Sequence, residues 1–114
     1  MAHLKLERAT SFTISYMLDD ETRTFEIAGE KARALASTLE ITGRTDGDSV
    51  GLVPFGRVQF HLPDAQTVKT FFVKPEQIET DGGSAIYLKR TFYDMVCEEA
   101  SADAGRHIDV LRRN

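Results

Sequence analysis

The sequence GRVQFHLPDAQTVKTFFVK, residues 56–74, predicts two strands joined by a turn. In its first arm apolar and polar side chains alternate, which is the pattern of a strand with one buried face. Pro63 ends that arm because it has no N–H group for a ladder, and the Asp64 carboxylate can bond the turn backbone. The second arm, residues 67–73, is rich in β-branched and aromatic side chains, as central strands are. We therefore expect this hairpin to form the middle of a sheet.

Two further hairpins are predicted, one on either side of the central one. In the first, two alternating segments are separated by polar turn residues, and the second is predicted from its Asp-Gly turn. The segments are residues 12–18 and 24–27 around a turn at 19–22, and residues 77–80 and 85–88 around a turn at 81–84.

A different period follows the first hairpin. Apolar side chains recur at i, i+3, i+4 and i+7 between Ala32 and Leu39, and charged or polar residues occupy the opposite side. This pattern predicts a helix over residues 30–42, with Gly43 in a left-handed C-terminal cap. Because alanines make the apolar stripe thin, this helix can lie close to a sheet.

The segment after the Asp-Gly turn has two interpretations. A helix that starts at residue 84 would also place apolar side chains on one face. We prefer a strand over residues 85–88, because Thr91 and Asp94 have the spacing of a capping box and would start a helix only there. The second helix is then expected over residues 92–101.

The remaining segments carry weaker patterns. Residues 44–49 are a loop by composition, and residues 50–55 are an edge segment or a lead-in, broken by glycine and proline. Residues 1–9 predict either a short strand or a frayed start, and residues 106–114 either a short helix or a strand.

Together these elements predict an α+β fold. Strands joined by short turns pair antiparallel, and a sheet with one apolar face needs helices to cover it. We expect an antiparallel sheet of about five to six strands, in the order ββα-ββ(ββ)-α, with two helices packed on one face. The chain has 114 residues, which predicts a single domain over residues 1–114, with residues 1–9 and 104–114 as candidate flexible ends.

Composition limits the environment of the protein. No apolar run approaches the roughly 20 residues that span a bilayer, and the N-terminal residues lack the apolar core of a secretory signal. Cys97 is the single cysteine, so it cannot form a disulfide within the chain, and a free thiol suits a reducing compartment. These features predict a cytoplasmic protein that does not enter a membrane.

No metal or cofactor is expected. Residues 46–51 begin like a calcium loop, but Val50 and Arg57 stand where that loop needs ligands. His3, His61 and His107 are too far apart in the sequence for a ligand motif. The glycine pair in residues 81–84 matches no phosphate-binding pattern and is a turn.

Catalysis has one candidate. Cys97, with His61 or His107 and a carboxylate such as Asp109, could form a thiol triad in space. Cys97 is expected in the middle of a helix and is followed by two glutamates, which would raise the pKa of its thiol. We prefer the interpretation of a small, half-buried thiol packed beside Tyr93, one turn earlier. We predict no catalytic residue, and we keep as an alternative a small enzyme or ligand-binding domain with a pocket between sheet and helices near Cys97 and His61.

Nucleic-acid binding is the third hypothesis. Basic and polar side chains of the central hairpin could share a face with an aromatic ring for stacking on a single strand. The net charge is −4, however, and residues 56–90 carry five basic and four acidic side chains. That balance does not attract a polyanion, so nucleic acid is not an expected partner.

The leading hypothesis rests on the adjacent pair Phe71 and Phe72. Since neighbouring strand residues face opposite sides, one ring belongs to the core, and the other is covered or exposed on a second face. An exposed apolar patch there would bind a protein partner or a second copy of the chain, unless the tail with Ile108, Val110 and Leu111 folds over it. We predict a small acidic non-catalytic protein-interaction module, of the inhibitor, immunity, chaperone or adaptor type. It would bind through the open sheet face or an edge, with Arg57, Gln59, His61, Lys69, Phe71 and Phe72 as candidates.

Overall fold

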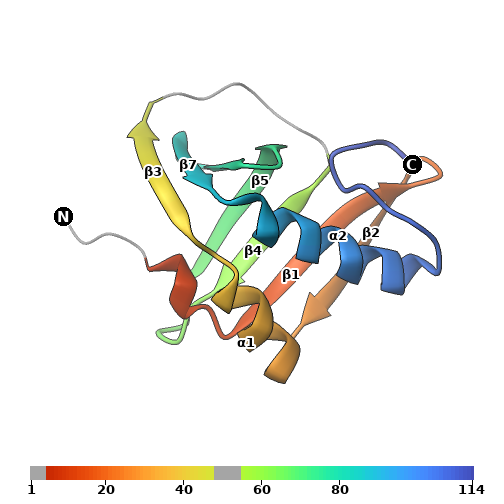
Figure 1. Cartoon of the computed structure of the whole chain (residues 1–114), viewed down its shortest axis with the longest axis horizontal. Helices are drawn as coiled ribbons and strands as arrows, with labels where there is room; N and C mark the ends of the chain where they lie inside the picture. Colours follow the sequence, from red (N-terminus) through yellow and green to blue (C-terminus); the bar gives the residue numbers. More distant parts are fainter. Residues whose placement is uncertain (1–4, 48–54) are drawn as a thin grey trace.

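The computed structural model describes residues 5–47 and 55–114. Within these residues it contains a seven-stranded antiparallel sheet, with both α-helices lying across one side of it (Figure 1). The predicted α+β class is confirmed, with more strands than expected. The strands are β1 (Ser11–Leu18), β2 (Glu21–Ile27), β3 (Ile41–Asp46), β4 (Arg57–His61), β5 (Thr67–Lys74), β6 (Gln77–Thr80) and β7 (Ser84–Leu88). The helices are α1 (Gly29–Ser37), α2 (Arg90–Ala104) and the 3-10 turn η1 (Leu6–Arg8).

The predicted central hairpin is the middle of the sheet. The strand order is β2-β1-β4-β5-β6-β7-β3, so β4 and β5 have a neighbour on both sides. Phe12 of β1 pairs with Phe60 of β4, and Thr13 pairs with Gln59. Because side chains alternate, the first pair lies on the face under the helices and the second on the opposite face, which we call the open face.

The first hairpin closes more tightly than the sequence indicated. Asp19 and Asp20 form a two-residue turn, and β2 begins directly afterwards at Glu21. Both aspartates have positive φ angles, 51° and 66°, which is the type I′ geometry that fits the twist of a hairpin. Aspartate tolerates this conformation because its carboxylate can bond locally.

The first helix is shorter than predicted, and a strand follows it. The hydroxyls of Ser37 and Thr38 bond the carbonyls of Ala34 and Leu35, so they end α1 by competing for its last turn. The expectation that residues 38–42 continue the helix is wrong, as is the loop predicted for residues 44–46.

Strand β3 occupies part of that segment and pairs with β7. Ile41, Thr42 and Thr45 are β-branched and favour this extended conformation. Gly43 lies at a bulge in the ladder rather than in a helix cap. Residues 1–4 and 48–54, with most of the expected edge segment at 50–55, lie outside the described residues.

The preference for a strand after the Asp-Gly turn is confirmed, since β6 and β7 form that hairpin. Helix α2 then begins at Arg90, earlier than expected. Lys89 is its N-cap and makes no side-chain capping bond, so Thr91 does not form the predicted capping box. The Arg90–Asp94 ion pair, 3.2 Å long, spans the first turn instead. Gly105, with φ of 72°, ends the helix in a left-handed cap.

The core lies between α2 and the sheet. Phe92 stacks on Phe60 with the ring centroids 5.7 Å apart, and it also contacts Phe12 and Phe72 at 6.2 and 6.0 Å. Tyr93, the next residue of α2, meets Phe72 edge to face at 5.0 Å. These aromatic contacts fix α2 across the central strands.

The segment after Gly105 is neither a helix nor a strand. It returns along α2 and ends beside the turn between β1 and β2, where the Asp19 N–H donates to the Asn114 carbonyl (Figure 1). Ile108 and Val110 are fully buried. This segment, residues 106–114, is the C-terminal tail, and it packs on the helix side. It therefore does not fold over the open face.

Candidate functional site

Five of the six candidate residues lie on the open face. Arg57, Gln59 and His61 alternate with the core residues of β4. In β5, Lys69 pairs with Gln59, and Phe71 pairs with Arg57. The central hairpin therefore presents these five side chains on one side of the sheet, as the alternation predicted.

The two phenylalanines do not provide an exposed aromatic patch. Phe72 is 0% exposed and belongs to the core under α2. Phe71 is on the open face but is only 5% exposed. Its neighbours on that face, Glu79 of β6 and Ala85 of β7, are fully buried. The open face is thus buried around Phe71, Glu79 and Ala85, whereas Lys69 and the part over β2, β1 and β4 are accessible.

The accessible part of the open face is polar. The His61 ring lies between two hydroxyls, with Nε2 2.7 Å from Thr13 Oγ1 and Nδ1 3.2 Å from Thr67 Oγ1. Ser15 and Thr24 bond across β1 and β2 at 3.1 Å. These cross-strand bonds hold a row of hydroxyl groups in place. A partner on this surface would make hydrogen bonds rather than apolar contacts.

Strand β2 forms one edge of the sheet. Among the described strands it pairs only with β1, and six of its seven residues are not buried. Because the turn has two residues, Leu18 and Glu21 exchange both main-chain hydrogen bonds, and so does every second pair after them. Thr22, Thr24 and Glu26 lie between those pairs and direct their N–H and C=O groups away from β1. This outward row is a template for another strand.

The sequence did not single out this edge. The alternation in residues 24–27 predicted a strand, but strand order was needed to show that it is outermost. At the opposite edge, β3 contains the Gly43 bulge, which disturbs the ladder. A bulge of this kind protects an edge from pairing. The uninterrupted edge is therefore β2.

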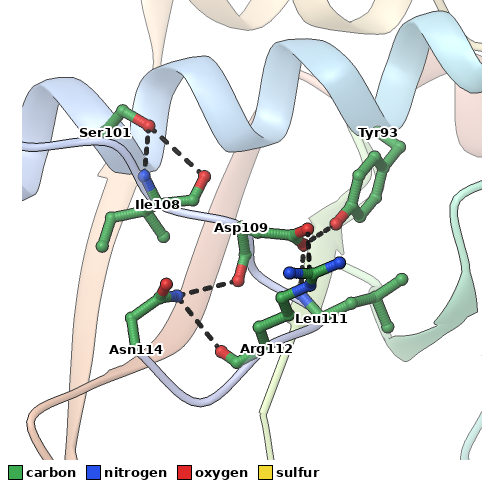
Figure 2. A network of polar contacts seen from close by, with 7 residues as sticks. All are labelled: Tyr93, Ser101, Ile108, Asp109, Leu111, Arg112 and Asn114. Atoms are coloured by element: carbon green, nitrogen blue, oxygen red, sulfur yellow. Dashed lines mark hydrogen bonds and ion pairs between the residues drawn. The ribbon is translucent and has the colours of Figure 1, made fainter.

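A cleft of about 390 Å³ lies between α2 and the C-terminal tail. Its lining includes Cys97, His107 and Asp109, the three residues of one predicted thiol triad. In Figure 2 the Asp109 carboxylate accepts hydrogen bonds from the Tyr93 hydroxyl and the Leu111 N–H. It is also 3.5 Å from Arg112 Nε. Asp109 thus serves to hold the tail against α2.

The same tail is anchored by Ser101, about two turns further along α2 than Tyr93. The Ile108 N–H donates to Ser101 Oγ at 2.8 Å (Figure 2). The Ser101 hydroxyl also donates to the Cys97 carbonyl at 2.7 Å. The Asn114 amide donates to the Asp109 carbonyl at 2.9 Å. The Asp109 carboxylate and the Ser101 hydroxyl therefore stabilise the packing of the tail on α2.

The Cys97 thiol lacks the setting of a nucleophile. Burial raises its pKa, and a hydrogen bond from the Val110 backbone lowers it by less. No hydrogen bond between described residues joins Cys97 to His107 or His107 to Asp109. His61 lies on the open face, on the other side of the sheet from α2. The expected pocket joining Cys97 and His61 between sheet and helices therefore does not form.

A wider hollow of about 680 Å³ opens between η1 and α1. Arg8 and Arg33 line it, with an apolar floor that includes Ala36 and Leu39. Its lining also includes Glu7, Thr10 and Ser37, but both hydroxyls donate to main-chain carbonyls, and none of the candidate residues lines it. The hollow is larger than the tail cleft, but it contains neither a thiol nor an imidazole.

The described part of the chain shows neither a metal-ligand cluster nor a membrane-spanning helix. No three His, Cys, Asp or Glu side chains in residues 5–47 and 55–114 are close enough to hold a metal ion. His3 and residues 48–51 of the calcium-like loop lie outside those ranges. No helix there is long and apolar enough to cross a membrane.

Comparison with known proteins gives no relative. No family model matches the chain, and neither a curated protein nor a solved structure matches it.

Proposed function

We propose that this protein is a non-catalytic protein-interaction module that binds an extended protein segment along β2. The observation that carries the proposal is the uninterrupted edge, where Thr22, Thr24 and Glu26 present main-chain donors and acceptors to solvent. An extended segment that pairs with this row gains backbone hydrogen bonds without a change in the fold. This is the mode called β-augmentation.

The accessible open face supports the same proposal. A strand added beside β2 would extend the row of hydroxyls formed by Thr24, Ser15 and Thr13. His61 and Gln59 continue this row on β4. Side chains of the bound segment would select among partners through hydrogen bonds on this face, while the backbone pairing supplies sequence-independent affinity.

Small-ligand binding in the tail cleft is the second candidate, because Cys97 and His107 do line one cleft. We rank it below edge binding, since burial raises the pKa of the Cys97 thiol and the Asp109 carboxylate is bonded to the tail. We also propose a cytoplasmic location, which the free thiol of Cys97 supports.

Thr24→Pro tests edge binding. The outward N–H of Thr24 makes no bond within the β1–β2 ladder, so proline removes a group that only a partner uses, and an edge strand tolerates it. Thr24→Ala is the matched control, because it shortens the same side chain and keeps the N–H. The probe is a phage library of random extended peptides, selected on immobilised wild-type protein.

The proposal predicts selected peptides whose affinity falls modestly for Thr24→Ala, which loses one hydroxyl, and about tenfold further for Thr24→Pro, which also loses the outward N–H. Circular dichroism and thermal unfolding must show that the proline variant keeps the fold. Selected peptides that bind all three proteins equally would show that another surface is used. A selection that enriches no peptide would also count against the proposal.

A further inference from the structure

We infer that β2 also pairs with β2 of a second copy of this chain, antiparallel and centred on Thr24. The inference rests on the proposed edge binding and names one partner for it. Three features of β2 support it: the positions of its outward main-chain groups, the side chains that would face each other, and the number of residues that would pair.

The main-chain groups of β2 fit their own copy. With a two-fold axis at Thr24, Thr24 faces Thr24 of the second copy, and Thr22 faces Glu26 at either end. All three residues direct their N–H and C=O groups outward. Each facing pair then exchanges two hydrogen bonds, so the edge gains about six. The two sheets become one continuous sheet with the helices on a single side.

The side chains are compatible in this register. On the open face, the threonine hydroxyls meet at the axis, and each Glu26 faces a Thr22 hydroxyl rather than another acid. On the helix side, Arg23 faces the half-exposed Phe25, where a guanidinium can lie over the ring. Glu21 faces Ile27 at the ends. No two like charges stand directly opposite, a condition for a stable cross-strand pairing.

Other symmetric registers satisfy fewer of these conditions. An axis at Glu26 would oppose two carboxylates, and an axis at Arg23 would oppose two guanidinium groups. An axis at Thr22 overlaps only the first three residues of the strand. An axis at Phe25 stacks two rings but loses two of the seven residues. The axis at Thr24 alone uses the whole of β2.

Native mass by light scattering, across a wide range of protein concentration, is the first test. We expect wild type to shift with concentration from 12.7 kDa toward twice that mass. Thr24→Pro should stay at 12.7 kDa because it loses hydrogen bonds at the axis. Thr24→Lys should do the same because it opposes two charges there, without affecting the monomer. Thr24→Ala keeps the outward N–H but loses the hydroxyl at the axis, so it should dimerise more weakly than wild type and more strongly than Thr24→Pro.

Cysteine cross-linking tests the register, in a Cys97→Ser background. Two Thr24→Cys chains would place their Cα atoms about 5.5 Å apart, within the roughly 4.4–6.8 Å that a disulfide spans. Thr22→Cys is the matched control on the same outward row. Its two copies would lie about 14 Å apart, since they are separated by four residues along the strand.

Each outcome is decisive. A disulfide dimer of Thr24→Cys, with little from Thr22→Cys, supports the inference. Equal cross-linking of both variants, or a dimer that Thr24→Pro and Thr24→Lys leave intact, overturns it. A wild-type protein that stays monomeric at every concentration also overturns it. In that case edge binding survives if selected peptides still distinguish Thr24→Pro from Thr24→Ala.

Discussion

Strands β6 and β2 lie in the same sheet but have opposite surroundings. In β6 three consecutive residues, Gln77, Ile78 and Glu79, are buried, so the strand is covered on both faces. In β2 only Ile27 is buried, and one long side of the strand has no partner among the described residues. The comparison teaches that the position of a strand in the sheet decides how much of it is buried. The β5–β7 part of the sheet maintains the fold, and the β2 end offers a surface.

Aromatic truncations should separate these two parts most strongly. Phe72→Ala removes a fully buried ring from the core and should cost about 3–5 kcal/mol of unfolding free energy. Phe71→Ala, on the open face of the same strand, should cost about 3 kcal/mol because that side is also covered. Urea unfolding measures both.

Phe25→Ala is the matched control on β2. Its ring is only half buried, so we expect a loss of about 1 kcal/mol. If Phe71→Ala lost as little unfolding free energy as Phe25→Ala, the Phe71 ring would not be buried on the open face. The two parts of the sheet would then not differ in burial.

The next largest effect is expected where the C-terminal tail meets the start of β4. Gly56 has a φ of 76°, and a Cβ at this position would lie 2.8 Å from the Val110 carbonyl oxygen. Gly56→Ala should therefore cost about 3 kcal/mol, from the left-handed backbone and from displacement of the tail. Thermal and urea unfolding report the loss.

Gly29→Ala isolates the backbone part of that cost. Gly29 has a similar φ of 65°, but nothing lies within 4 Å of an added Cβ. This variant should lose only about 1–2 kcal/mol. Equal losses for the two variants would mean that the tail does not press against Gly56.

A pH effect is expected from Tyr16, on the helix side of β1. Burial, with the hydrogen bond that its hydroxyl donates to Asp103 Oδ2, raises the pKa of Tyr16 to about 12. The folded state therefore holds this proton more tightly than the unfolded state, whose tyrosine pKa is about 10. The resulting stability is present below pH 10 and is lost as the pH rises toward 12.

This contribution to the unfolding free energy is at most about 3 kcal/mol, since each of the roughly two pKa units corresponds to about 1.4 kcal/mol. Urea unfolding of wild type and Tyr16→Phe, from neutral pH to pH 12, measures it as the difference between the two curves. The curves should converge above pH 10. Parallel curves would show that the Tyr16 hydroxyl titrates equally in both states.

The smallest effect is expected on the accessible open face. Gln59 is half exposed on β4, and Gln59→Ala should change the unfolding free energy by less than about 0.5 kcal/mol. A loss above about 1 kcal/mol in urea unfolding would show that this face packs against another part of the chain. That result would remove it as a binding surface.

Alternation and turn chemistry allowed much of this fold to be predicted. The pattern in residues 56–74 placed the central hairpin correctly, and the Asp-Gly turn placed β6 and β7. These signals are local, so the sequence displays them directly. The helix predicted over residues 30–42 is longer than α1, because the apolar period continues to Leu39. The hydrogen bonds that end α1 come from Ser37 and Thr38. Strand β3 depends on pairing with β7, which no local pattern reveals.

The candidate site was predicted less well. Alternation correctly grouped Arg57, Gln59, His61 and Lys69 on one face. It could not show that Phe71 would be buried there, because its burial depends on tertiary contacts that a local pattern does not reveal. The β2 edge was missed for the same reason, since strand order decides which strand is outermost.

Amide hydrogen exchange along β2, resolved by residue, tests the edge most directly. In dilute protein, Arg23 and Phe25 should be protected by their bonds to β1, while Thr22, Thr24 and Glu26 exchange freely. On binding of a selected peptide, or at a concentration where the dimer forms, the account predicts protection of all three outward amides. If a partner binds and those three amides still exchange freely, β2 is not the docking edge.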